Sequence, residues 1–173
     1  MPDNNSFGDR VFRRNVILSA IGMLAIAIGG VFLKGLPGFH DSREASATTA
    51  PVFQDAQGIA IHGHDPLGYF SDGKPVRGKP EHSLKWNGAT WWFVSEENKA
   101  KFAEMPETYA PRYGGYCAYA ASQGYIASTV PEAWTIQEGK LYLNYSLSVK
   151  EKFDADREAY ISKADQNWPE LIK

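Results

Sequence analysis

The stretch that decides the fold runs from His82 to Cys117 and reads HSLKWNGATWWFVSEENKAKFAEMPETYAPRYGGYC. Residues 83–94 place aromatic and β-branched side chains on both sides of Asn87-Gly88. This dipeptide readily takes the positive φ angles of a tight hairpin turn. The stretch therefore opens with two predicted paired strands.

A helix is predicted directly after the hairpin. Ser95 offers a side-chain N-cap, and Glu96 and Glu97 follow it where the helix dipole favours negative charge. The helix should run from Glu96 to about Met105, because Pro106 cannot continue it.

An irregular passage follows this helix. Pro111, Gly114 and Gly115 break regular structure there, and glycine lets the backbone approach a bound group closely. Cys117, the chain's only cysteine, comes directly afterwards. We therefore expect a functional site at this passage.

Tyrosines crowd the passage and suggest an aromatic pocket that stacks a ligand or a cation. Core and turn packing is the alternative explanation of such a cluster. The residues predicted to line the pocket are Arg112, Tyr113 and Tyr116.

The order of several motifs resembles the YHS domain family. The motifs are W-N-G-x-x-W-x-F, S-E-E-N-K, F-x-x-x-P-x-x-Y and P-x-Y-G-G-Y-C-A, and bacterial proteins of this type also carry G-x-D-P-x-x-Y-F, present here from Gly63 to Phe70. The likeness extends from about Ile59 to Trp168. It implies a small α+β module with an association to metal binding.

The chain departs from the metal-associated members in its cysteines. Those members resemble D-P-V-C-G-M near the start and F-C-S-x-x-C after the hairpin. The matching places here hold Leu67 and Gly68, then Phe93, Val94, Ser95 and Asn98, so the paired thiols are absent.

Other donors could bind a metal. His62 and His64 lie two apart, so on a strand both side chains share one face, and Asp65 is adjacent. His82 or Cys117 could complete a set for a transition metal such as zinc or copper if the fold brings them near. The alternatives are solvent-facing histidines and a buried cysteine that acts as a small hydrophobic side chain.

Composition and charge limit the possible functions. A length of 173 residues with 43% hydrophobic and 22% charged residues suits one compact domain with an appendage. A net charge of −2 with no basic cluster argues against nucleic-acid binding. No phosphate-binding loop, nucleotide fingerprint, Ser-His-Asp order or internal repeat is evident, so we do not expect an enzyme.

The appendage is predicted to be a membrane anchor. Arginines at 10, 13 and 14 precede an uncharged, largely apolar run, and nineteen helical residues would span about 28 Å, close to the thickness of a bilayer core. Residues 1–14 should be cytoplasmic and 15–34 should cross the inner membrane, because flanking arginines stay inside. Residues 35–51 form a tether, and the domain at 52–173 faces the periplasm.

Cleavage of this segment is the alternative. Arg13-Arg14 resembles a twin-arginine export signal, and Ala45-Ser46-Ala47 offers a cleavage site near Ala47. The domain would then be secreted to the periplasm. Both interpretations export it.

The predicted fold is α+β. A short strand at 58–64, a second hairpin turning at Glu138-Gly139 and a terminal helix from Ser148 to Pro169 complete the elements. The two hairpins should form one small antiparallel sheet packed against two or three helices.

Two functions follow from these features. The first is a membrane-tethered YHS-like binding module for a metal ion or small ligand. The alternative is a non-catalytic interaction domain that serves a membrane-protein partner, and an enzyme using Cys117 or the histidines ranks third.

Overall fold

The structure, a computed structural model, describes residues 49–173. The predicted cytoplasmic segment 1–14, the predicted membrane segment 15–34 and nearly all of the tether lie outside the described residues. Within residues 49–173, no helix is both long and apolar enough to cross a membrane.

The first half of the domain contains six short elements. They are the 3-10 helix η1 (Ile61–Gly63), α1 (Gly68–Ser71), β1 (Lys79–Trp86), β2 (Ala89–Phe93), α2 (Glu96–Glu104) and α3 (Pro106–Tyr109). We name this half the first repeat.

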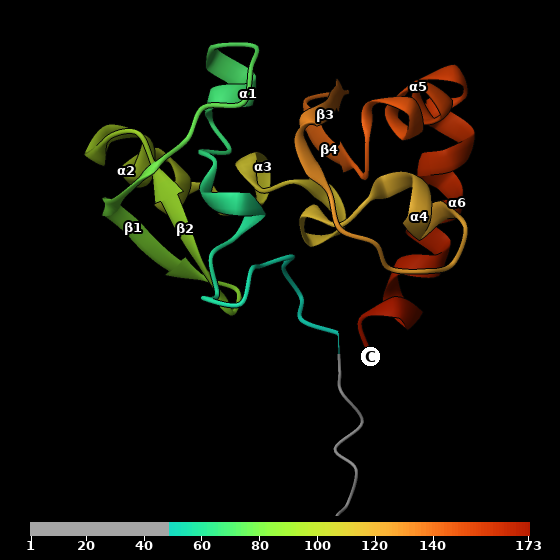
Figure 1. Cartoon of the computed structure of the whole chain (residues 1–173), viewed down its shortest axis with the longest axis horizontal. Coiled ribbons are helices and arrows are strands. Elements are labelled where there is room, and N and C mark those ends of the chain that lie inside the picture. Colours follow the sequence, from blue (N-terminus) through green and yellow to red (C-terminus); the bar gives the residue numbers. More distant parts are fainter. Residues whose placement is uncertain (1–48) are drawn as a thin grey trace, which may run out of the picture. The chain divides into compact units, whose positions relative to one another are not determined.

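The second half contains six elements of the same kinds in the same order. They are the 3-10 helix η2 (Arg112–Gly115), α4 (Ala118–Ser122), β3 (Val130–Gln137), β4 (Lys140–Asn144), α5 (Leu147–Ala155) and α6 (Arg157–Leu171). We name this half the second repeat, and Figure 1 shows the two halves side by side.

The two halves are copies of one supersecondary unit. Strands β1 and β3 are both eight residues long and begin 51 residues apart, and helices α2 and α5 are both nine residues long with the same spacing. The hairpin registers also match. Lys79 pairs with Phe93 and Val130 pairs with Asn144, and in both hairpins the register shifts directly after this first pair. The expectation of a chain without repeats is therefore wrong.

The repeat escapes notice in the sequence because few side chains are shared between the copies. Those that are shared serve the hairpin turn, the helix cap and the core: Gly88 and Gly139, Ser95 and Ser146, and Phe102 and Phe153. Backbone geometry has been kept while most surface and packing residues have changed.

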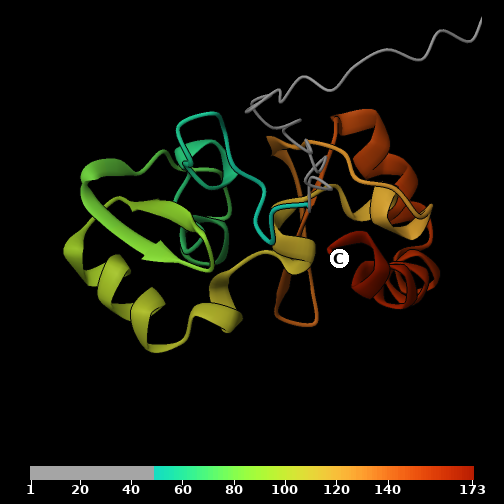
Figure 2. The same cartoon turned by 90° about the horizontal axis from the view of Figure 1, so that it is seen from below.

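Both predicted hairpins and the helix after Ser95 are confirmed, but the single sheet is not. Each hairpin forms its own two-stranded antiparallel sheet. Helix α2 contacts β1 and β2, whereas α5 contacts β3 and β4. No hydrogen-bond ladder joins the two sheets within residues 49–173, and Figure 2 shows the two hairpins apart from one another.

Strand β4 lies between two parts of the core. Leu141 and Leu143 belong to a cluster built mostly from the first repeat, and Tyr142 belongs to a second cluster with Phe153. Residues 141–144 of the strand are therefore buried on both faces, as in central strands.

Residues 58–64 do not form the predicted strand. Isolated bridges join Ile59 to Thr90 and His64 to Arg77, and between them Ile61 and His62 have positive φ angles of 39° and 57°. The Ile61 amide donates to the carbonyl of Phe53, which replaces a strand ladder with a turn.

The terminal helix differs from the prediction at both ends. It begins after Ser146, whose side chain accepts from the Val149 amide, and a residue outside helical geometry, Asp156, divides it into α5 and α6. Helix α6 continues past Pro169 to Leu171. The division corresponds to the break at Met105 between α2 and α3, so it belongs to the repeated unit.

Candidate functional site

A cleft of about 410 Å³ lies where the two repeats meet. The first repeat contributes its hairpin turn and α3, and the second contributes η2 and the end of α6. Its walls combine aromatic rings with three polar side chains: Pro51, Val52, Trp86, Asn87, Trp91, Glu107, Ala110, Pro111, Arg112, Tyr113, Gly114, Trp168 and Ile172.

The aromatic walls of the cleft are held by neighbouring rings. Trp86 lies 5.5 Å from Phe102 between ring centroids, in an edge-to-face contact. Trp168 lies 5.7 Å from Tyr113 and 6.0 Å from Tyr116 on the opposite side. Because these rings are fixed by packing, little side-chain entropy remains to be lost when a ligand enters.

Arg112 and Tyr113 share one carboxylate behind the cleft. An Arg112 guanidinium nitrogen lies 3.2 Å from Asp165 Oδ1, and the Tyr113 hydroxyl donates to the same oxygen at 3.0 Å. Burial raises the pKa of Tyr113, and the hydrogen bond to Asp165 raises it further. Tyr113 is therefore a neutral hydrogen-bond donor at physiological pH.

Two of the three residues predicted to line a ligand pocket lie at this cleft. Arg112 and Tyr113 line the cleft, whereas Tyr116 lies behind it against Phe53 and Trp168. Sequence reasoning missed Trp86, Trp91, Trp168 and Glu107. The two hairpin tryptophans were visible beside the Asn87-Gly88 turn, but nothing local indicated that this turn meets the end of α6.

Asp65, a predicted metal ligand, is a structural hydrogen-bond acceptor. Its carboxylate is fully buried. One oxygen accepts from the Leu67 amide at 2.9 Å, and the other accepts from the Val94 amide at 2.9 Å and the Asn98 side chain at 2.8 Å. These contacts tie α1 to the start of α2 and occupy both carboxylate oxygens.

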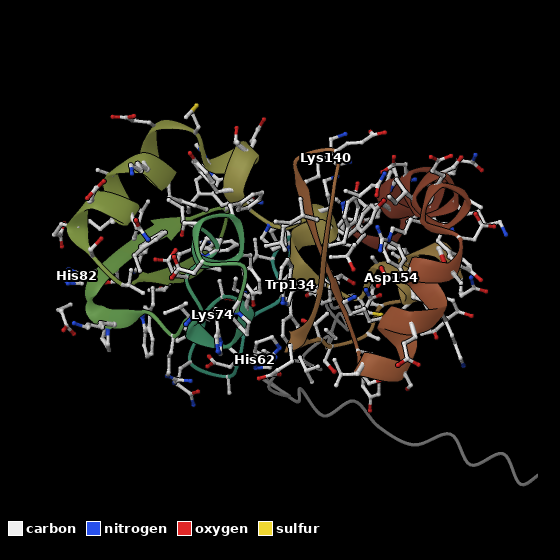
Figure 3. The ribbon with its side chains drawn as sticks, turned by 90° about the horizontal axis from the view of Figure 1, so that it is seen from above. His62, Lys74, His82, Trp134, Lys140 and Asp154 are labelled. Atoms are coloured by element: carbon white, nitrogen blue, oxygen red, sulfur yellow. The ribbon has the colours of Figure 1, made fainter. Side chains whose placement is uncertain are left out.

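The three histidines predicted as metal ligands lie in different surroundings. His62 Nε2 donates to the Thr129 carbonyl at 2.6 Å, so that nitrogen carries a proton. His82 Nδ1 lies 2.9 Å from Glu96 at the outer edge of the first repeat, away from His62 (Figure 3). His64 Nδ1 is buried without a partner among the described residues, and burial lowers the His64 pKa.

Cys117 occupies the place in the second repeat that Asp65 occupies in the first. Cys117 stands directly before α4, and Asp65 stands before α1 with Pro66 and Leu67 between them. The backbone amide of Asp65 donates to the Val76 carbonyl, and that of Cys117 donates to the Ala127 carbonyl. The Cys117 sulfur accepts from the Ala120 amide at 3.4 Å. Burial raises the pKa of the Cys117 thiol, which therefore stays protonated.

These five donors do not form a metal site. No three or more His, Cys, Asp or Glu side chains within residues 49–173 are grouped to hold a metal ion. The Asp65 oxygens accept hydrogen bonds from Leu67, Val94 and Asn98, Cys117 is buried, and His82 is paired with Glu96. The donors present therefore do not fit a transition metal.

Comparison with known proteins finds one match, and it falls in the first repeat. A family model of the YHS domain matches residues 67–113. The match begins at α1 and ends in η2, so it covers most of the first repeat and stops where the second begins. No curated protein and no solved structure matches the chain.

The structure shows what replaces the cysteine positions of metal-associated YHS members. Val94 and Asn98, which stand at two of those positions, both donate hydrogen bonds to Asp65. The contact of Val94 is made by its backbone amide, whereas Asn98 uses its side-chain amide.

Proposed function

We propose that this chain is a membrane-tethered, exported binding module of the YHS type that holds a small ligand in the cleft between its two repeats. The cleft carries the proposal, because it joins a concave aromatic surface to a few convergent polar groups, the usual form of a small-molecule site. The YHS family is associated with metal binding, but the donors of this chain do not fit a metal.

A co-purified ligand is the direct test of the cleft. The full-length chain, extracted gently from its host membrane, should carry a small molecule detectable by native mass spectrometry. Trp168→Leu should abolish that mass shift, because Trp168 forms one wall. Trp134→Leu is the matched control, since Trp134 is also half-buried but packs on Tyr69 outside the cleft. Equal loss in both variants, or retention in both, would contradict the proposal.

The membrane tether rests on the sequence alone. The uncharged run from Asn15 to Leu33 is long enough to span a bilayer, and the arginines before it favour export of the domain. Alkaline phosphatase fused after Lys173 should be active. A fusion that is inactive while a cytoplasmic reporter at the same place works would overturn the topology.

Metal handling by the predicted donors has its own test. The purified chain should show no change in melting temperature when Zn²⁺ or Cu⁺ is added, because an ion that binds only the folded state must stabilise it. A rise that disappears in the double variant His62→Ala, His64→Ala, or in Cys117→Ser, would restore the metal hypothesis.

The protein-interaction alternative is favoured by one observation. Tyr125 and Leu147 are more than half exposed in the second repeat, where the corresponding places of the first repeat hold Lys74 and Glu96. Exposed apolar side chains can mark a contact surface. Leu147→Glu restores the residue of the first repeat and should release any membrane-protein partner that co-purifies with the wild-type chain.

A further inference from the structure

We infer that the cleft between the repeats selects a small organic cation, of the quaternary ammonium type. This inference rests on the proposed function and names the class of ligand for the same site.

Aromatic faces supply the first part of the argument. Trp86 and Trp168 line the cleft from the two repeats and are both partly exposed, whereas Trp91 and Tyr113, which also line it, are buried at 1% and 3% exposure. The electron-rich faces of such rings attract cations, with tryptophan the strongest of the aromatic side chains. A methylated ammonium group has a low desolvation cost and an apolar surface, so it matches such walls.

The charges around the cleft supply the second part. Arg112 is the only cationic side chain among the described residues that line the cleft. It is paired with Asp165 at 3.2 Å and also lies 5.7 Å from the centre of the Tyr113 ring. Glu107 takes part in none of the ion pairs found within residues 49–173. Once Arg112 is balanced by Asp165, Glu107 leaves the cleft with a negative charge.

The end of helix α6 adds to this field. Ile172 follows the last residue of this fifteen-residue helix and lines the cleft. The last carbonyl groups of a helix carry a partial negative charge that favours a nearby cation. The aromatic rings, the Glu107 carboxylate and the end of α6 therefore all favour a cation in the cleft.

The test compares choline with 3,3-dimethylbutan-1-ol, which has the same shape but a carbon in place of the charged nitrogen. Binding to the full-length chain in detergent is followed by calorimetry and by tryptophan fluorescence. We expect choline to bind on the order of tenfold more tightly than the alcohol, the difference expected when a cation meets several desolvated rings. Equal affinity would overturn the inference while leaving the cleft a binding site.

Two charge variants predict changes of opposite sign. Glu107→Gln should weaken choline binding several-fold, and Arg112→Gln should strengthen it, because one removes an attraction and the other a repulsion. Neither should change binding of the neutral alcohol. Glu104→Gln, an exposed carboxylate on α2 outside the cleft, should change nothing.

Two further outcomes separate the inference from the proposed function. If choline and its analogue fail to bind but native mass spectrometry finds another molecule that is lost in Trp168→Leu, the cation class is wrong and the proposed function stands. If neither probe binds and no molecule co-purifies, both are wrong.

Discussion

Asp65 shows how one side chain can look like a functional residue in sequence and prove structural in the fold. Its position beside two histidines suggested a metal ligand, yet both oxygens accept hydrogen bonds from the backbone and from Asn98. In the second repeat a thiol takes the same place. A neutral thiol makes weaker hydrogen bonds than a carboxylate. The start of the short helix is therefore fixed by a carboxylate in the first repeat and by a thiol in the second.

Replacing Asp65 should cost much of the domain's stability. Asp65→Ala leaves the Val94 amide and the Asn98 side chain without their acceptor in a buried place, and we expect a loss of about 3 kcal/mol in the free energy of unfolding. Urea denaturation measures it, with Asp72→Ala at an exposed position as the control. A loss similar to that of the control would show that the carboxylate is not a structural acceptor.

Gly114 and Gly139 form a natural comparison, since both have positive φ angles, 59° and 70°. A Cβ on Gly114 would lie 2.0 Å from the Pro51 carbonyl oxygen, whereas one on Gly139 would meet nothing within 4 Å. Gly139→Ala should therefore cost about 1 kcal/mol for backbone strain alone. Gly114→Ala should cost clearly more in the same denaturation assay, and equal losses would contradict this packing.

At the scale of elements, the repeated unit is a hairpin followed by a capped helix. Ser95 accepts from the Asn98 amide and Ser146 accepts from the Val149 amide, so each hairpin ends in the same cap. The hairpins themselves were predictable from their turn residues. Their arrangement as two separate sheets was not, because alternation along a strand does not specify which other strands lie beside it.

The shared cap predicts similar effects in both repeats. Ser95→Ala and Ser146→Ala should each lower the free energy of unfolding by about 1 kcal/mol, the usual loss for an N-cap serine. Ser148→Ala should have a smaller effect, because Ser148 lies inside α5 and contacts only the Ser146 hydroxyl. If Ser148→Ala lowered the free energy of unfolding more than Ser146→Ala, the helix would begin at Ser148, as the sequence predicted, and not after Ser146.

At the scale of the whole molecule, the YHS match describes one half of a duplicated domain. The second repeat adds the long helix α6 and the passage at η2, and these meet the turn of the first hairpin at the cleft. A single repeat would lack the wall formed by Trp168. The proposed binding function is therefore a property of the pair.

The pH dependence of stability follows from His64, which lies near Arg77 and Glu132 where the repeats meet. Burial lowers its pKa in the folded state below the usual value of 6.5, so below that pH the unfolded chain binds more protons. The contribution of neutral His64 to the free energy of unfolding should be fully present above pH 6.5 and should decrease as the pH falls below that value. His64→Tyr, which introduces the residue at the corresponding place of the second repeat, should flatten the melting temperature between pH 7 and pH 5.5.

Local patterns in the sequence were enough to predict both hairpin turns, the cap at Ser95 and the YHS likeness that the family model matches at residues 67–113. These depend on φ preferences, capping and short motifs, which act within a few residues. Only the tertiary structure decided that the unit occurs twice, that Asp65 and Cys117 are equivalent, and that Trp86 and Trp168 share a cleft. Those features relate residues about fifty to eighty positions apart in the sequence, where packing geometry rather than local preference selects the neighbours.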